Sequence, residues 1–223
     1  GDVYKRQLPF PLPDGYSVLD RTVLSGAPIE AAKTLLGCVI VIPAEHVIAT
    51  ITEVEAYGGP VDQRYPDPAA HCFMGPTARN RAMFGPAGHW YIYRSYGIHF
   101  CANITSATDG TGGGVLVRSV RIEQGLDAVR RRRGEKPAVA GLGRGPGNVG
   151  QALGLDLNDY GVDALDPSSR VFVAQPESIN PDKDIHAGPR VGVRRAANRP
   201  WRLWLPDDSV SAYRRHKKAV EEF

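Results

Sequence analysis

Cysteine, long apolar stretches and net charge are all scarce in this 223-residue chain. Its three cysteines, Cys38, Cys72 and Cys101, lie far apart and form no CxxC motif, so we expect neither a disulfide framework nor a bound metal. The longest apolar stretch, 35–44, is interrupted by a glycine and a proline, whereas a membrane span requires about 20 apolar residues. We therefore expect a reducing, intracellular location and no membrane partner.

Glycine and proline are abundant by contrast, with 25 and 18 residues. Together they make up about 19% of the chain, where an average protein has about 12%, so many turns and irregular connections are expected. The sequence contains no internal repeat, and the Gly- and Pro-rich stretch 134–150 is followed by no obvious second core. We expect a single domain over 8–223, preceded by a leader at 1–7 that is not native to it.

The pattern of apolar and turn residues predicts a mixed α+β (α/β) fold. Strand-like segments cluster early without βαβ alternation, which favours a curved, largely antiparallel sheet with surrounding helices. A protruding β-hairpin is expected over 89–104, with its turn at 94–97. We further expect an extended arm over 8–15, helices over 28–36, 77–84 and 123–133, and strands over 38–42, 47–57, 115–120, 171–174, 190–194 and 202–205.

The strand expected over 47–57 carries two acidic side chains. Side chains alternate between the faces of a strand, which places Glu53, Glu55 and Tyr57 on one face together with Ile51. Carboxylates on a half-buried face are costly unless they are paired or used. We therefore expect the two carboxylates to be paired or used, and we assign Glu53 a supporting role, with a surface carboxylate as the alternative.

The expected hairpin is rich in aromatic residues. Tyr91 and Tyr93 share a face, Asn103 lies on the return strand, and Tyr96 falls at the turn, where its side chain would project outward. A bulky apolar side chain at an exposed tip is a liability unless something receives it. DNA is such a binding partner, because some proteins insert an apolar side chain between base steps in the minor groove.

Together these segments resemble the alkyladenine (3-methyladenine or methylpurine) DNA glycosylase family. The matching blocks run in order from about residue 17 to 206 and no lysine falls within them. They comprise 52–57 (TEVEAY), Ala70-His71, 76–84 (PTARNRAMF), 91–103 (YIYRSYGIHFCAN), 115–118 (VLVR), Gly145-Pro146, 151–153 (QAL) and 190–193 (RVGV).

The resemblance implies base-excision repair of alkylated or deaminated purines in duplex DNA. The damaged base would be flipped out and its N-glycosidic bond hydrolysed, without cofactor, metal or lyase activity. Glu55 matches the general base that activates the attacking water. Arg118 and the backbone carbonyl of Val191 match the groups that help to hold that water.

The resemblance also implies how the damaged base is bound. Tyr57, His71 and Tyr93 match the residues that sandwich the flipped base. Asn103 matches the residue that would clash with the 2-amino group of guanine, and Tyr96 the residue that fills the vacated gap. Candidate contacts to the DNA backbone are Arg79, Arg81, Arg94 and Arg144.

The small net charge of +3 hides a strong partition along the chain. Segment 118–144 carries eight basic and three acidic residues, and segment 183–218 carries ten and three. We expect these segments to face DNA phosphates, although a solvated helix face is the alternative for the arginine run 130–133. The partner is damaged double-stranded DNA, the protein is expected to be a monomer, and its location is the bacterial cytoplasm (nucleoid) or a eukaryotic nucleus.

Three other functions remain open from the residues. The chain could be a non-catalytic nucleic-acid binding module of the same fold, or a metal-dependent hydrolase of small nucleosides. A glycoside hydrolase using Glu53 and Glu55 is the third. Their side chains would point the same way on one strand, which is a poor geometry for carboxylates that flank a sugar.

Overall fold

The computed structural model describes residues 12–178, 180 and 182–221. The leader expected at 1–7, and residues 8–11 of the expected arm, lie outside these described residues. Nine strands are present in the described part: β1 (Tyr16–Val18), β2 (Val39–Ile42), β3 (Val47–Tyr57), β4 (Trp90–Ser95), β5 (His99–Thr105), β6 (Gly114–Gln124), β7 (Phe172–Pro176), β8 (His186–Gly188) and β9 (Arg202–Trp204). The α-helices are α1 (Pro28–Leu35), α2 (Leu126–Arg133) and α3 (Pro146–Leu153). Short 3-10 helices span Arg21–Leu24, Pro43–Glu45, Arg81–Phe84, Val139–Gly141 and Leu157–Asp159.

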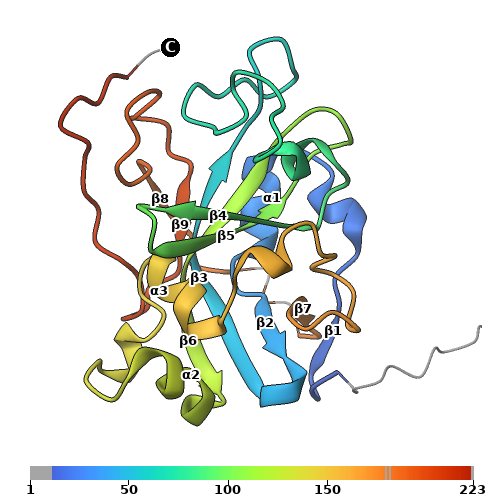
Figure 1. Cartoon of the computed structure of the whole chain (residues 1–223), viewed down its shortest axis with the longest axis vertical. Helices are drawn as coiled ribbons and strands as arrows, with labels where there is room; N and C mark the ends of the chain where they lie inside the picture. The colour runs from blue at the N-terminus through green and yellow to red at the C-terminus, as the bar shows by residue number, and fades with distance from the viewer. Residues whose placement is uncertain (1–11, 179, 181, 222–223) are drawn as a thin grey trace, which may run out of the picture.

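The strands form one sheet in the order β1-β7-β2-β3-β6-β5-β4, with β9 also paired to β3 and β8 to β9, and every pairing between these nine strands is antiparallel. The long strand β3 is central: β6 pairs along one edge, while β2 and then β9 share the other. In Figure 1 the sheet curves, and the β4–β5 hairpin crosses in front of β3. The expected mixed α+β fold with an antiparallel sheet in a single domain is confirmed.

One hydrophobic core joins the three α-helices to the sheet. Helix α1 forms where expected: Pro28 occupies its first turn, and Gly37 follows its end with φ +89°. Such a left-handed conformation costs glycine little and ends a helix cleanly. Its buried residues Ala31, Ala32 and Leu35 pack into the same core as the β3 residues.

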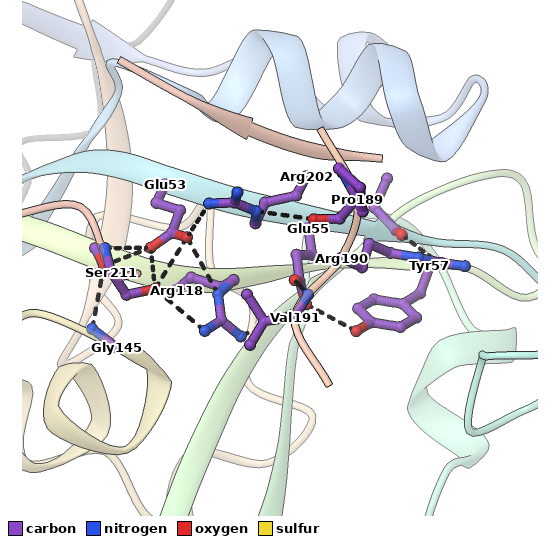
Figure 2. A network of polar contacts seen from close by, with 12 residues as sticks. Glu53, Glu55, Tyr57, Arg118, Gly145, Pro189, Arg190, Val191, Arg202 and Ser211 are labelled. Carbon is purple, nitrogen blue, oxygen red and sulfur yellow. Dashed lines mark hydrogen bonds and ion pairs between the residues drawn. The ribbon is translucent and has the colours of Figure 1, made fainter. Parts of the chain in front are cut away.

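The sequence placed Ile51 on the same face of β3 as Glu53 and Glu55, and this assignment is wrong. The ladder between β3 and β6 is irregular at Ile51–Val54. Thr52 on β3 and Arg118 on β6 are each left out of the register. Ile51 therefore lies on the core face with Val54, while Glu53 and Glu55 point to the opposite side. Bulges re-aim side chains in this way, and this one also turns Arg118 toward the carboxylates (Figure 2).

Helix α3 was not expected, since its sequence is rich in glycine. These glycines allow the helix to approach β5 closely: a Cβ on Gly150 would lie 1.9 Å from the carbonyl oxygen of Phe100. A Cβ on Gly147 would similarly meet the ring of His99. Tertiary packing thus outweighs the low helix propensity of glycine.

Other expected boundaries also need correction. Residues 190–194 form an irregular loop instead of a strand, and the helix expected from 123 starts at 126 because β6 continues through Gln124. Segment 77–84 is a turn followed by a 3-10 helix over Arg81–Phe84. The hairpin turn lies one residue later than expected, with Tyr96 and Gly97 at φ +50° and +70°.

All three cysteines are buried and free. Of the helices in the described part of the chain, none has both the length and the hydropathy to cross a membrane. In the same part, no three His, Cys, Asp or Glu side chains gather as metal ligands would.

Candidate active site

A cavity of about 660 Å³ lies where the last residue of β3, the β4–β5 hairpin and the loop 191–195 meet. This cavity brings together segments that are far apart in the sequence. It is lined by most of the expected site residues: Tyr57, His71, Tyr93, Asn103, Tyr96, Val191, Arg79 and Arg94. It is also lined by Tyr91, Arg194 and Arg195, which sequence reasoning did not assign to the site.

Glu55 is fully buried beside this cavity, with its carboxylate held by three partners (Figure 2). The Tyr57 hydroxyl donates to Oε1 over 2.8 Å, and the Val191 N–H donates to Oε2 over 2.6 Å. The guanidinium of Arg118 lies 3.6 Å from Oε1. A carboxylate has about four acceptor positions, so these three partners leave about one position unused. Val191 thus binds Glu55 through its N–H, a contact that the sequence did not predict, since the role expected of its carbonyl was to hold the water.

Glu53 has many more partners than Glu55. Its oxygens accept from Ser119 Oγ (2.7 Å), from the N–H of Ser211 (3.0 Å) and from its Oγ (2.8 Å). Arg118 and Arg202 add charged contacts at 3.3 and 3.1 Å. Neither Glu53, Glu55 nor Arg118 lines the cavity directly, but Glu55 is bonded to two residues that do, Tyr57 and Val191. The saturation of Glu53 removes the geometric basis for a glycoside hydrolase pair of Glu53 and Glu55.

Arg118 links the two carboxylates, because its Nε binds Glu53 while its Nη1 faces Glu55. Burial lowers the pKa of Arg118, but the charges of Glu55 and Glu53 outweigh burial and raise it above its usual value. The guanidinium is therefore a permanent positive charge that fixes both acids.

Aromatic rings form the walls of the cavity. The rings of His71 and Tyr93 meet edge-on at 4.5 Å, and His71 Nδ1 lies 3.1 Å from the hydroxyl of Tyr91. Burial and the charge of Arg79 lower the pKa of His71, so the imidazole is neutral near pH 7. Burial, and then the charge of Glu55, raises the pKa of Tyr57 well above its usual value. Its phenol thus stays protonated and donates to Glu55.

Asn103 and Tyr96 occupy opposite extremes of exposure. Asn103 is buried at the cavity wall, where its side-chain amide donates to the carbonyl of Tyr91 over 3.2 Å. Tyr96 is 94% exposed at the hairpin tip, next to the exposed Ile98. Two exposed apolar side chains at one turn fit a surface that inserts into a partner.

A buried ion pair that the sequence did not reveal connects the two loops around the cavity. Arg190 donates to both oxygens of Asp67, at 2.6 and 3.0 Å, and both side chains are fully buried. Burial alone would raise the pKa of Asp67, but the hydrogen bonds and charge of Arg190 hold it below its usual value. The Arg190 guanidinium also lies 4.8 Å from the ring centre of Tyr57. The only signal in the sequence was a pair of acids, Asp62 and Asp67, in a loop of 13 residues at 58–70, too weak to select a partner 123 positions away.

The basic residues do not all lie where the charge partition suggested. In segment 118–144, Arg118 is buried, Arg121 binds Glu123 and Asp207, and Arg132 binds Glu45. Four of the segment's eight basic residues, Arg118, Arg121, Arg130 and Arg132, therefore pair with acids of the protein itself, so only part of the segment's charge is available to phosphates. Among the candidate backbone contacts, Arg79 and Arg94 line the cavity, whereas Arg81 and Arg144 do not. Arg144 is exposed and donates to the carbonyl of Asp208.

Comparison with known proteins finds relatives that match most of this chain in sequence. A protein of Mycobacterium sp. (strain KMS) is 50% identical over 193 residues, which is 86% of this chain and 92% of that protein. A protein of Mycolicibacterium fortuitum is 50% identical, with 86% and 96% covered, and one of Nocardia farcinica is 48% identical, with 86% and 90% covered. All three carry the name "Putative 3-methyladenine DNA glycosylase".

These relatives and the family model define the class of protein as a DNA glycosylase, a hydrolase of the N-glycosidic bond. The family model for methylpurine-DNA glycosylase matches residues 22–209. The chain therefore belongs to the methylpurine-DNA glycosylase family, as its sequence motifs suggested.

Proposed function

We propose that this protein removes alkylated purines such as 3-methyladenine from duplex DNA by flipping the damaged nucleotide into the cavity beside Glu55. The observation that carries the proposal is a buried carboxylate, restrained by Tyr57, Val191 and Arg118, next to a cavity with aromatic walls. Flipping is required because the reacting sugar carbon cannot be reached inside the base stack.

The flipped base would lie between Tyr57 on one side and His71 with Tyr93 on the other. Among the described residues, the ring of Tyr57 makes no ring–ring contact with His71 or Tyr93, although all three line one cavity. Stacking on aromatic rings favours any base, and a cationic alkylated purine gains further from the electron-rich tyrosine faces. Asn103, held by Tyr91, would exclude the 2-amino group of normal guanine.

The chemical step would break the bond between C1′ and the base nitrogen. Glu55 takes a proton from a water molecule, the water oxygen forms the new bond to C1′, and the base leaves with the electrons of the broken bond. The same carboxylate stabilises the positive charge that builds up on the sugar. Arg118 and Val191 would keep the carboxylate oriented, and the Val191 carbonyl remains a candidate for holding the water.

We further propose that the enzyme has no lyase activity and acts as a monomer. A lyase forms a Schiff base between an amine and C1′, and the described residues that line the cavity include no lysine. Tyr96 at the hairpin tip would fill the gap left by the flipped base, while Arg79 and Arg94 contact phosphates nearby.

A single-turnover excision panel tests this function. Duplexes containing 3-methyladenine, 7-methylguanine, hypoxanthine or ethenoadenine are incubated with the wild type, with Glu55→Gln and with the exposed control Glu135→Gln. We expect excision of at least one cationic purine by the wild type and the control. Borohydride should trap no covalent adduct with DNA. Failure to excise any of the four bases would contradict the proposal, and a trapped adduct would contradict the absence of lyase activity.

A further inference from the structure

The C-terminal segment, residues 211–220, lies beyond the part of the chain that the family model matches. It carries Arg214, Arg215, Lys217 and Lys218, all of them exposed. From this segment we infer a second DNA-binding surface beside the cavity, one that contacts the phosphates flanking the flipped nucleotide. The inference rests on the proposed function, because it takes the cavity as the place where DNA binds.

The segment is held against the cavity loop at several points. Its start is fixed where the Ser211 N–H donates to Glu53, and the ring of Tyr213 lies 5.6 Å from the Arg202 guanidinium. The N–H of Gly192 then donates to the carbonyl of Arg214 over 2.9 Å. Figure 1 shows this red segment beside the orange-red loop that contains residues 191–195.

The end of the segment is fixed to the same loop. The N–H of Val220 donates to the carbonyl of Arg194 over 2.8 Å, and the N–H of Ala197 donates to the carbonyl of Val220 over 3.0 Å. The backbone is thus restrained on both sides of the basic run. Charges that are positioned before binding lose less entropy when they meet a partner.

The basic side chains of the segment are available for a partner. Arg215 donates to the neutral side chain of Asn198. In the described part of the chain, Arg214, Lys217 and Lys218 have no acidic residue within ion-pair distance. The arginines of α2 contrast with them, because Arg130 and Arg132 have acidic partners.

The position of this surface favours DNA backbone as its ligand. Arg194 and Arg195 line the cavity itself, so the segment extends an already basic cavity mouth. A duplex whose nucleotide enters the cavity must run its backbone across that mouth, with a phosphate about every 3.4 Å of each strand. Exposed arginine and lysine side chains at this place neutralise phosphates without reading sequence.

The test compares two doubly neutralised variants with the same net charge. Arg214→Gln/Lys217→Gln changes the segment, and Arg131→Gln/Lys136→Gln changes exposed residues on and after α2. Helix α2 follows Gly125, which packs against Val47, so it lies at the end of β3 opposite Tyr57. Duplex affinity is measured by fluorescence anisotropy, with and without a lesion, from about 50 to 200 mM salt.

We expect Arg214→Gln/Lys217→Gln to bind both duplexes about tenfold more weakly at the lowest salt. Its slope of log affinity against log salt should be shallower by about 2, or about 1 per lost phosphate contact. The α2 variant should stay within about twofold of the wild type. If the first variant is not folded by thermal denaturation, Lys217→Gln/Lys218→Gln replaces it.

The inference would be overturned if Arg214→Gln/Lys217→Gln bound DNA with the affinity and salt slope of the wild type. It would also be overturned if Arg131→Gln/Lys136→Gln lost as much DNA affinity as that variant. Either result, together with excision by the wild type, leaves the proposed function intact. A wild type that excises no lesion would instead contradict the proposed function, while a selective loss of DNA affinity in the segment variant would still support the surface.

Discussion

Glu53 and Glu55 stand two residues apart on β3, and both are fully buried, yet their surroundings differ sharply. Glu53 accepts from two serines and pairs with two arginines, so every part of its carboxylate is occupied. Glu55 has a hydroxyl, one N–H and one more distant guanidinium as partners, and the first two belong to Tyr57 and Val191, which line the cavity. Proximity on a strand therefore does not imply a shared role.

The difference shows how one strand can hold a structural and a reactive carboxylate together. A buried charge is tolerated only when it is paired and hydrogen-bonded. Glu53 meets this condition fully and ties β3 to β6, β9 and the C-terminal segment. Glu55 meets it with acceptor capacity to spare, which is what a base acting on water requires.

Removing the saturated carboxylate should have the largest effect on stability. Glu53→Ala leaves Arg118 and Arg202 buried without their main acid, so the free energy of unfolding should fall by about 3–5 kcal/mol. Urea denaturation of this variant and of exposed Glu135→Ala measures the difference, and the control should change by less than about 0.5 kcal/mol. A Glu53→Ala protein as stable as the wild type would mean that the network is not structural.

Asp67 is a second saturated carboxylate, and it extends the comparison to the loops around the cavity. Asp67→Asn keeps the shape and some hydrogen bonds but removes the charge that faces Arg190, so stability should fall by about 2–3 kcal/mol. Thermal and urea unfolding check this value. A loss below about 0.5 kcal/mol would show that the pair contributes only to the position of the loops.

The exposed hairpin tip should behave in the opposite way to both carboxylates. Tyr96→Ser removes a side chain that is 94% exposed, so unfolding should change by less than about 0.5 kcal/mol. Capture of lesion-containing DNA should weaken by about tenfold, or about 1.4 kcal/mol, because the vacated gap is no longer filled. Loss of stability with unchanged binding would place Tyr96 among packing residues.

The smallest of these effects should be the pH dependence of stability that the ion pair between Asp67 and Arg190 contributes. The pKa of Asp67 is below its usual 3.8 in the folded protein, so its contribution is complete above that value and is lost as the pH falls through the folded pKa. Unfolding experiments from pH 5 to 3 should show a shallower decline for Asp67→Asn than for the wild type. Parallel declines would contradict a lowered pKa.

The elements predicted well from sequence are those specified locally. Strand β3 spans the residues 47–57 that its β-branched content predicted, and helix α1 lies between a proline and a glycine. Much of the cavity lining was also predictable, because five of the eight motif blocks contribute residues to it.

What sequence reasoning missed depends on contacts between distant segments. The irregular ladder at Thr52 and Arg118 breaks strict alternation, so the face assigned to Ile51 was wrong. Helix α3 depends on glycines that fit against β5, and Asp67 pairs with Arg190 across 123 positions. Nothing local in the sequence identifies such partners.

The contrast between Glu53 and Glu55 is tested most directly by measuring stability and single-turnover excision together on Glu53→Gln and Glu55→Gln. We predict that Glu55→Gln keeps DNA binding and folds with near wild-type stability, while its excision rate falls by about 10³-fold, or about 4 kcal/mol of barrier. Glu53→Gln should lose stability and, at a temperature where it is folded, retain most of its excision rate. Wild-type excision by Glu55→Gln would contradict the account.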